Sequence, residues 1–241
     1  IGLSVLYADE HLVIVDKPSG LVVHPGAGNP SGTLMNGLLH HYPELAKLPR
    51  AGIVHRLDKD TTGVMVVART LHAHKMLVEA ISARSVKREY VAVVQGLPTG
   101  GGKINAPIGR DPRSRTRMAV VAGGRHAVTH FRVEERYPRH AALAIQLETG
   151  RTHQIRVHLA HLGYPIVGDT TYSGRARRTA GLGPAAVAAV NTFTRQALHA
   201  RRLSFDHPID ASPCAFEASL PSDVVALMSV LRADGSAATE S

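Results

Sequence analysis

Hydrophobic positions in this chain fall into short runs that suit strands better than long helices. Residues 12–16, 64–67 and 91–94 are almost unbroken apolar runs rich in Val, bounded by polar or turn residues, which is typical of strands buried on both faces. Residues 142–147 alternate instead, as a sheet with one buried face requires. Further extended segments are expected at residues 3–7, 21–23, 118–121, 126–136, 197–205 and 215–220.

Helical patterns are fewer. Helices are expected at residues 33–42, 70–84, 152–162, from 184 and from 222. Thr70 is placed as the N-cap of the second, and Ser222 with Asp223 caps the last. The chain is therefore expected to be one composite α/β domain in which strands predominate.

The helix expected at residues 152–162 places one arginine apart from its apolar side chains. Ile155, Leu159 and Leu162 form its expected buried stripe, and Gly163 suits the position after its end. Arg156 falls on a different face. It is therefore expected to project away from the buried stripe.

The connections carry glycine and arginine. Residues 26–32 and 99–103 are glycine-rich, but no Gly-Lys-Ser/Thr follows, so flexible connections are favoured over a phosphate-binding loop. Residues 173–191 are rich in Gly, Arg and Ala and indicate an excursion from the main fold. The connection at residues 110–117 holds four arginines and is interpreted first as a solvated basic loop, second as a phosphate-contacting one.

Length and composition bound the kind of protein. The apolar fraction of 44% and charged fraction of 20% fit a globular chain with ample core, and no run is long enough to span a membrane. A single cysteine, Cys214, excludes an internal disulfide framework and indicates a cytoplasmic location. The domain is expected to cover residues 1–233, followed by a frayed tail at 234–241. Because the first residue is Ile1, a piece of a longer chain is expected.

Net charge is +9 at pH 7, and arginine supplies most of the excess. Such an excess favours a polyanionic partner, because neutralised phosphates release counterions. Arginine also binds phosphate through two parallel hydrogen bonds and stacks on bases. Aromatic residues make up only 4% of the chain, so a stacking platform for general single-strand binding is poorly supplied.

The most informative short segment is His55 to Gly63, HRLDKDTTG, directly before the buried run at residues 64–67. Arg56 and Lys59 flank Asp58, and nearby cations favour an ionised carboxylate. Such a carboxylate on a rigid element can act as nucleophile, general base or cation partner. From these nine residues alone, a loop held by surface ion pairs is the favoured interpretation.

Other catalytic classes find little support. The chain has 15 histidines, but no HExxH, and His153 and His158 are five residues apart where metal ligands on one helix face prefer three or four. Cys214 has no nearby base in the sequence, and the Gly-x-Ser-x-Gly pattern of many hydrolases is missing. A metal-dependent nuclease is therefore kept only as a minor hypothesis, one that chelators would test.

Three segments taken together resemble the successive motifs of the RluA-type pseudouridine synthases. They are HRLD with Thr62-Gly63, KREYVA at residues 87–92 and GRTHQIRVH at residues 150–158. Flanking matches are DKPSGL at residues 16–21, GYPIVGDTTY at residues 163–172 and Leu198-His199-Ala200. The segments follow the family's order over nearly all of residues 1–221, and the closest likeness is to a branch that modifies large-subunit ribosomal RNA.

The resemblance implies a fold and a reaction. The implied fold is of the α/β (α+β) class, a mixed, largely antiparallel sheet in two halves with flanking helices and a basic active-site cleft. The implied enzyme is an isomerase that converts specific uridines of 23S ribosomal RNA to pseudouridine, with neither cofactor nor metal required. Members of that branch also carry an N-terminal S4-type RNA-binding domain, which is expected to be absent from this chain.

Site residues follow from the matched motifs. The resemblance implies that Asp58 is the nucleophile, attacking C1′ or C6 of the uridine, or a base that assists glycal formation. Arg156 would pair with Asp58, and Tyr90 would pack on the base and take part in proton transfer at C5. Arg56 would fill the gap left by the flipped nucleotide. Further RNA contacts are expected from Arg151, His153 and Lys59.

The expected partner is large-subunit ribosomal RNA or the assembling large ribosomal subunit, with no membrane partner and a monomeric enzyme. A binding protein offers the main alternative: a ribosome-assembly factor that kept the fold and lost the reaction. Asp58, Tyr90 and Arg156 are all present, which argues against that alternative.

Overall fold

The computed structural model describes residues 1–174 and 179–237. The chain forms two units, each built from two segments. Unit 1 comprises Ile1–Glu89 and Ala200–Ser219, and unit 2 comprises Tyr90–His199 and Leu220–Ser241. Two of the three boundaries fall inside strands β4 (Lys87–Gln95) and β10 (Leu198–Asp206), where no linker-like composition marks them, and the third follows Ser219.

Unit 1 is a sheet with small helices around it. Its strand order is β1-β2-β3-β10, and β11 pairs with β10. The remaining bounds are β1 Val5–Ala8, β2 Leu12–Lys17, β3 Thr62–Ala68, β11 Pro213–Glu217, α1 Leu34–His41, η1 Pro43–Lys47, η2 Pro49–Gly52 and α2 Leu71–Ser82. The pairs β1–β2, β2–β3 and β10–β11 are antiparallel. All seven residues of β3 are buried, which agrees with its unbroken apolar run.

Local sequence explains the unit 1 helices. Thr70 caps α2 by accepting the Ala73 N–H, which confirms the expected N-cap, and α2 packs against β3. Thr33 and Asn36 form a reciprocal capping box at the start of α1. The extended segment expected at residues 21–23 is wrong as a strand, because its carbonyls instead accept the first N–H groups of α1.

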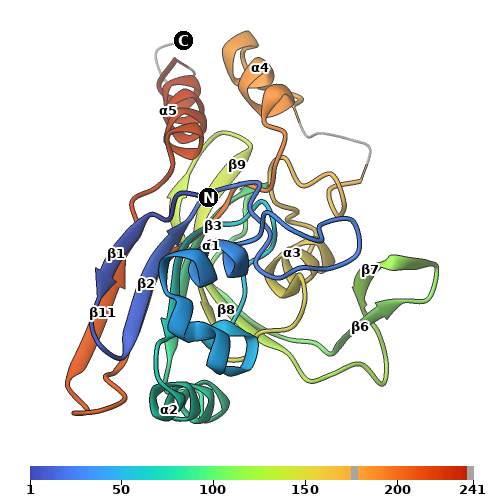
Figure 1. Ribbon diagram of the computed structural model, residues 1–241. Coiled ribbons are helices and arrows are strands. Elements are labelled where there is room, and N and C mark those ends of the chain that lie inside the picture. Colours follow the sequence, from blue (N-terminus) through green and yellow to red (C-terminus); the bar gives the residue numbers. More distant parts are fainter. Residues whose placement is uncertain (175–178, 238–241) are drawn as a thin grey trace. The chain divides into compact units, whose positions relative to one another are not determined.

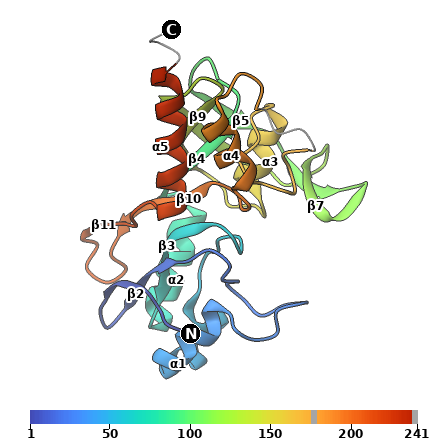
Figure 2. The same cartoon turned by 90° about the horizontal axis from the view of Figure 1, so that it is seen from above.

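Unit 2 has a second run of strands in the order β4-β9-β8-β5 and a separate two-stranded sheet, β6-β7. Its remaining bounds are β5 Gly102–Asn105, β6 Ile108–Asp111, β7 Ser114–Val120, β8 Val128–Arg136, β9 His140–Leu147, α3 Gln154–His161, α4 Pro184–Thr192 and α5 Ser222–Ala237. α4 and α5 lie side by side (Figure 1 and Figure 2). The expected mixed α/β class, with a largely antiparallel sheet and flanking helices, is confirmed.

Two segments that were expected to be connections contain strands in the structure. Residues 108–120, expected to be partly a solvated basic loop, form the β6–β7 hairpin, which extends beyond α3 (Figure 1). β5 begins within the glycine-rich connection expected at residues 99–103. Backbone pairing with β8 orders β5 although its residues carry little apolar pattern.

The expected faces of α3 also change. Leu162, assigned to the buried stripe, is 40% exposed, whereas Arg156, expected to project away, is only 7% exposed. The helix is buried on most sides, so periodicity alone could not select the solvent face. The reason for the burial of Arg156 is an acidic partner outside the helix.

The C-terminal end differs as well. Residues 234–237, expected to be frayed, continue α5, and the Gly183 N–H donates to Asp234 Oδ1 at 2.8 Å. The rest of the expected tail, residues 238–241, and residues 175–178 of the expected excursion lie outside the described residues. Within the part of the chain that is described, no helix combines the length and apolar character needed to cross a bilayer.

Candidate functional site

The side chains singled out in the sequence fall in both units. Unit 1 holds Arg56, Asp58 and Lys59. Unit 2 holds Tyr90, Arg151, His153 and Arg156.

The Asp58 segment of unit 1 is a tight connection between η2 and β3. The Thr61 N–H donates to the Asp58 carbonyl oxygen at 3.1 Å and closes a turn directly after the carboxylate. Leu57 is buried, Asp58 is half-buried, and Arg56 and Lys59 are exposed. The backbone is thus anchored through Leu57 while the polar side chains reach the surface of the unit.

A buried lysine, Lys17, fixes the turn that follows Asp58. Lys17 is 0% exposed, and its Nζ donates to the carbonyl oxygens of Pro18 at 2.9 Å, Leu21 at 2.8 Å and Lys59 at 2.8 Å. An ammonium group has three N–H donors, and each has a carbonyl acceptor here. The bond to Lys59 ties the residue after Asp58 to the end of β2.

The start of the segment is held by a neutral histidine. His55 Nε2 accepts the Val66 N–H at 3.0 Å, so this nitrogen carries no proton. Burial, and after it the nearby Arg88 guanidinium, lower the pKa of His55 to about 3. The end is held by Gly63, whose φ is +117° and where a Cβ would lie 2.1 Å from the Ala200 carbonyl oxygen, so only glycine fits.

Positive charge gathers around Arg56 within unit 1. The pKa of His24 is lowered by burial and then by the Arg56 and Arg50 guanidinium groups. Arg50 and Ala51 both adopt left-handed backbone conformations, with φ of 50° and 51°. Left-handed conformations of non-glycine residues are strained, and such strain is frequent at binding sites. The surroundings of Arg56 therefore suit an anionic ligand.

Tyr90 lies in strand β4 and opens the first segment of unit 2. It is 6% exposed and therefore buried. A buried tyrosine in a strand presents a flat apolar surface and one hydroxyl group.

Arg156 makes a buried ion pair within unit 2. Its Nε donates to Asp169 Oδ2 at 2.7 Å and its Nη2 donates to Asp169 Oδ1 at 3.0 Å. Asp169 is only 1% exposed. Two parallel bonds of this kind fix both the position and the plane of a guanidinium group.

The carboxylate of Asp169 is itself held by its turn. Oδ1 accepts the N–H groups of Thr171 at 3.0 Å and Tyr172 at 3.2 Å. Gly168 precedes it with φ of +78°, where a Cβ would lie 2.0 Å from the Arg195 carbonyl oxygen. The turn therefore holds the Asp169 carboxylate in place through its own backbone, independently of the ion pair with Arg156.

Tyr172 completes this network. Its ring centroid is 5.0 Å from Arg156 Cζ and 5.3 Å from Arg117 Cζ. Its Oη accepts the Met118 N–H at 3.0 Å and lies 2.7 Å from His153 Nδ1. Two predicted residues, His153 and Arg156, therefore meet at one side chain that the sequence had not singled out.

The residues before Arg156 are tied to the surrounding strands. His153 is the N-cap of α3 and adopts a left-handed conformation, with φ of 55° and ψ of 21°. Arg151 donates through Nε to the His126 carbonyl oxygen at 2.9 Å, and its backbone N–H donates to Gln154 Oε1 at 3.0 Å. Gln154 also donates to the Val128 carbonyl oxygen at 3.0 Å. This start of α3 is fixed by side-chain bonds instead of by a serine or threonine cap.

Sequence reasoning gave no role to Asp169 or Tyr172 beyond their place in the GDTTY match. A usable signal existed in the glycine before Asp169 and the two threonines after it, a pattern typical of a turn closed by an aspartate side chain. Within residues 1–174 and 179–237, no group of three or more His, Cys, Asp or Glu side chains has an arrangement that could hold a metal ion.

Comparison with known proteins points to one family. The family described as RNA pseudouridylate synthase matches residues 11–161. Ribosomal large subunit pseudouridine synthase D of Xanthomonas campestris pv. campestris is 57% identical over 240 residues, which is 100% of this chain and 72% of that protein. The protein of the same description from Escherichia coli K12 is 53% identical over 97% of this chain and 72% of its own length.

Solved structures agree. Human RNA Pseudouridylate Synthase Domain Containing 4 is similar with a TM-score of 0.74 and 28% identity, over 95% of this chain and 93% of that one. Human RNA Pseudouridylate Synthase Domain Containing 1 shares the fold, with a TM-score of 0.69 and 24% identity over 90% of this chain and 83% of that one.

Proposed function

Because the chain belongs to the RNA pseudouridylate synthase family, whose members are isomerases, we propose that it converts uridines of large-subunit (23S) ribosomal RNA to pseudouridine. The observation that carries the proposal is the 57% identity, over 100% of this chain, to a protein described as acting on the large ribosomal subunit. The net charge of +9 supports a nucleic acid partner.

The reaction would break the N1–C1′ bond of uridine, turn the base while it stays bound, and join C5 to C1′. N1 gains a proton and C5 loses one, so the product is an isomer of the substrate and no water is consumed. Asp58 would attack C1′ or C6. Support comes from the way its turn is held: the carbonyl of Lys59 by Lys17, and the start of the segment by His55.

Arg156 would pair with Asp58 and keep the carboxylate ionised. The two bonds to Asp169 use Nε and Nη2. A guanidinium group has five N–H donors, so the bonds to Asp169 leave capacity for a second carboxylate. Tyr90 would pack on the base, and Arg56 would occupy the gap left by the flipped nucleotide, for which its exposure and positive surroundings suit it.

Tritium release from C5-labelled uridine in ribosomal RNA tests the function directly. The wild-type chain should release tritium, and Asp58→Asn should reduce release at least about 1,000-fold, because the nucleophile is lost. Asp60→Asn, a neighbouring carboxylate in the same turn, is the matched control and should keep most of the activity. Retained turnover in Asp58→Asn would remove Asp58 from the mechanism. No release by the wild-type chain, with intact RNA binding, would instead favour a silent assembly factor.

Arg156→Ala separates catalysis from binding. Turnover should fall much more than RNA affinity, because the proposed role of this guanidinium group is to hold the carboxylate. Electrophoretic mobility-shift titration of the same RNA measures affinity alongside the tritium assay. Equal losses of turnover and affinity would show that Arg156 serves only to bind RNA.

A further inference from the structure

Tyr172 is the point at which two elements of unit 2 meet. The guanidinium of Arg156 on α3 and that of Arg117 on β7 both lie within 5.3 Å of its ring centroid. A guanidinium over an aromatic ring is attracted by the ring quadrupole, more strongly where water is excluded. Among the residues described, the Nε of Arg117 is buried without a hydrogen-bond acceptor, and the Tyr172 ring lies beside the same guanidinium group.

The hydroxyl group adds a second link to the same elements. Tyr172 Oη accepts the Met118 N–H of β7 and bonds His153 Nδ1 at the start of α3. A hydroxyl can accept two hydrogen bonds and donate one, so it serves both partners at once. Tyr172 also packs with Met118 against the buried Ile108 and Val157.

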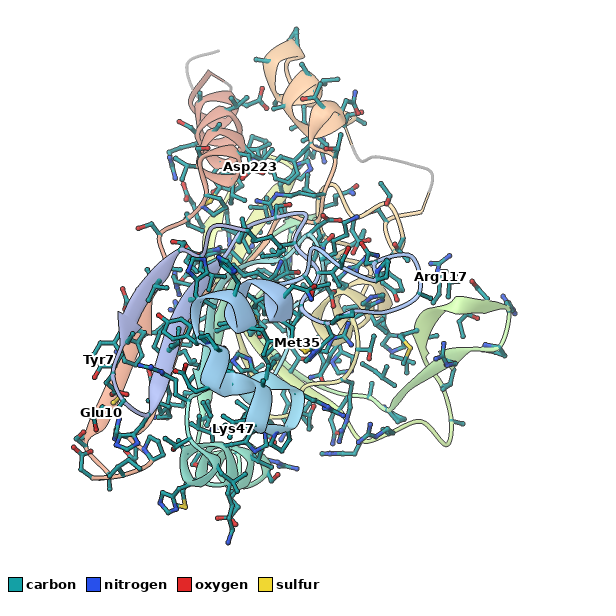
Figure 3. All side chains as sticks on the ribbon, in the orientation of Figure 1. Tyr7, Glu10, Met35, Lys47, Arg117 and Asp223 are labelled. Atoms are coloured by element: carbon teal, nitrogen blue, oxygen red, sulfur yellow. The ribbon has the colours of Figure 1, made fainter. Side chains whose placement is uncertain are left out.

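The β6–β7 hairpin needs such links at its base. It is a separate two-stranded sheet, and a two-stranded sheet is marginal on its own in water. Arg110 and Arg113 are exposed on it, and Arg117 lies on β7, where Figure 3 labels it. The side chain of Arg115 lies outside the described part of the chain. The hairpin therefore carries positive charge outward, and its orientation depends on contacts such as those to Tyr172.

Asp169 and Tyr172 constrain Arg156 in different ways. The carboxylate holds one edge of the guanidinium through Nε and Nη2. The ring contacts the guanidinium group as a whole and limits how far it can tilt about that edge. Loss of the ring would leave the ion pair in place with a freer orientation.

We propose that Tyr172 is a positioning residue that couples the β6–β7 hairpin to the guanidinium of Arg156. The inference rests on the proposed function, in which Arg156 acts beside Asp58. A ligand that fixes the hairpin, such as a polyanion bound to its arginines, also fixes Tyr172 and the orientation of Arg156. A change that displaces the hairpin loosens the orientation of Arg156, so it lowers turnover more than RNA affinity.

The test compares kcat and KM on large-subunit ribosomal RNA for single and double variants. Tyr172→Phe keeps the ring and loses the hydroxyl, and Tyr172→Leu loses both. We expect kcat to fall severalfold in the first and at least tenfold in the second, with KM changed less than threefold. Tyr164→Leu, at a half-buried tyrosine directly after α3, is the control and should change kcat less than twofold. Each kcat is divided by the concentration of folded protein, which circular dichroism measures.

Arg117→Met supplies the coupling test. It should lower kcat in the wild-type background and have little further effect in Tyr172→Leu, because the shared ring is already gone. If Tyr172→Leu fails to fold, the same cycle is run with Tyr172→Met, which also lacks the ring. Unchanged kcat per folded molecule, or fully additive effects, would overturn the proposal and leave Tyr172 a structural residue. Failure of the proposed function is distinguishable, because the wild-type chain would then release no tritium from C5-labelled uridine, whereas failure of the present proposal leaves wild-type turnover intact.

Discussion

Lowering the pH should destabilise the protein through His55, the residue that begins the Asp58 segment. In the folded chain its Nε2 accepts the Val66 N–H, and the pKa of the ring is lowered to about 3 by burial and by Arg88. Protonation would place a second donor against that N–H and break the bond. The folded state therefore resists taking up a proton that the unfolded chain binds readily.

Proton linkage gives the sign and size of the change in the free energy of unfolding with pH. The ordinary pKa of 6.5 applies to the unfolded chain, so below about pH 6.5 the unfolded state binds one more proton at His55 than the folded state. The stability from this group is complete above that pH and is lost at about 1.4 kcal/mol per pH unit as the pH falls toward the folded value. At pH 5 the full loss would be about 2 kcal/mol, and partial exposure of the residue reduces it to about 1–2 kcal/mol.

Urea unfolding followed by circular dichroism between pH 8 and pH 5 measures the effect. His55→Gln keeps an acceptor for the Val66 N–H and does not titrate, so the free energy of unfolding should depend less on pH in the variant than in the wild type. The buried His140, whose pKa burial lowers to about 4, contributes its own dependence, and His140→Leu removes it separately. Parallel profiles for wild type and His55→Gln would refute the argument.

Three further changes test the fold around the site. Asp169→Asn leaves its buried arginine beside a neutral amide and should cost about 3–5 kcal/mol in urea unfolding, where a loss under about 1 kcal/mol would contradict a structural ion pair. Thr70→Ala should cost about 1 kcal/mol in thermal unfolding through the lost cap of α2, and Thr70→Ser should restore most of it. Gly63→Ala should cost more than about 3 kcal/mol because of the close carbonyl, whereas Gly123→Ala, also at positive φ but facing open space, should cost about 1 kcal/mol by the same measurement.

Strands were the most predictable part of the fold. The apolar runs at residues 12–16, 64–67 and 91–94 lie within β2, β3 and β4, because a run of buried β-branched residues leaves few alternatives. Of the β6–β7 hairpin, only the end of β7 was predicted, as the extended segment at residues 118–121, and the rest was missed for the opposite reason. Its arginines mask the alternation of a strand, and backbone pairing with packing at one end determines its conformation.

Side-chain partners far apart in sequence were the least predictable part of the site. The motif at residues 150–158 drew attention to Arg156, but its burial depends on Asp169, thirteen residues later in a turn. Lys17 shows the same limit, since its nearest sequence context is a turn and its acceptor at Lys59 is 42 residues away. The chemical type of such a residue can indicate a functional or structural role in the sequence, but its hydrogen-bond partners are known only from the folded backbone.

The interleaving of the two units has a consequence for biosynthesis. β3 leaves the ribosome long before β10, its neighbour in unit 1, has been translated. At about 5–20 residues per second, the interval of roughly 130 residues lasts on the order of ten seconds. During that time a strand that is wholly buried in the folded protein has one unpaired edge, so nascent chains stalled between the two strands should be the species that chaperones hold longest.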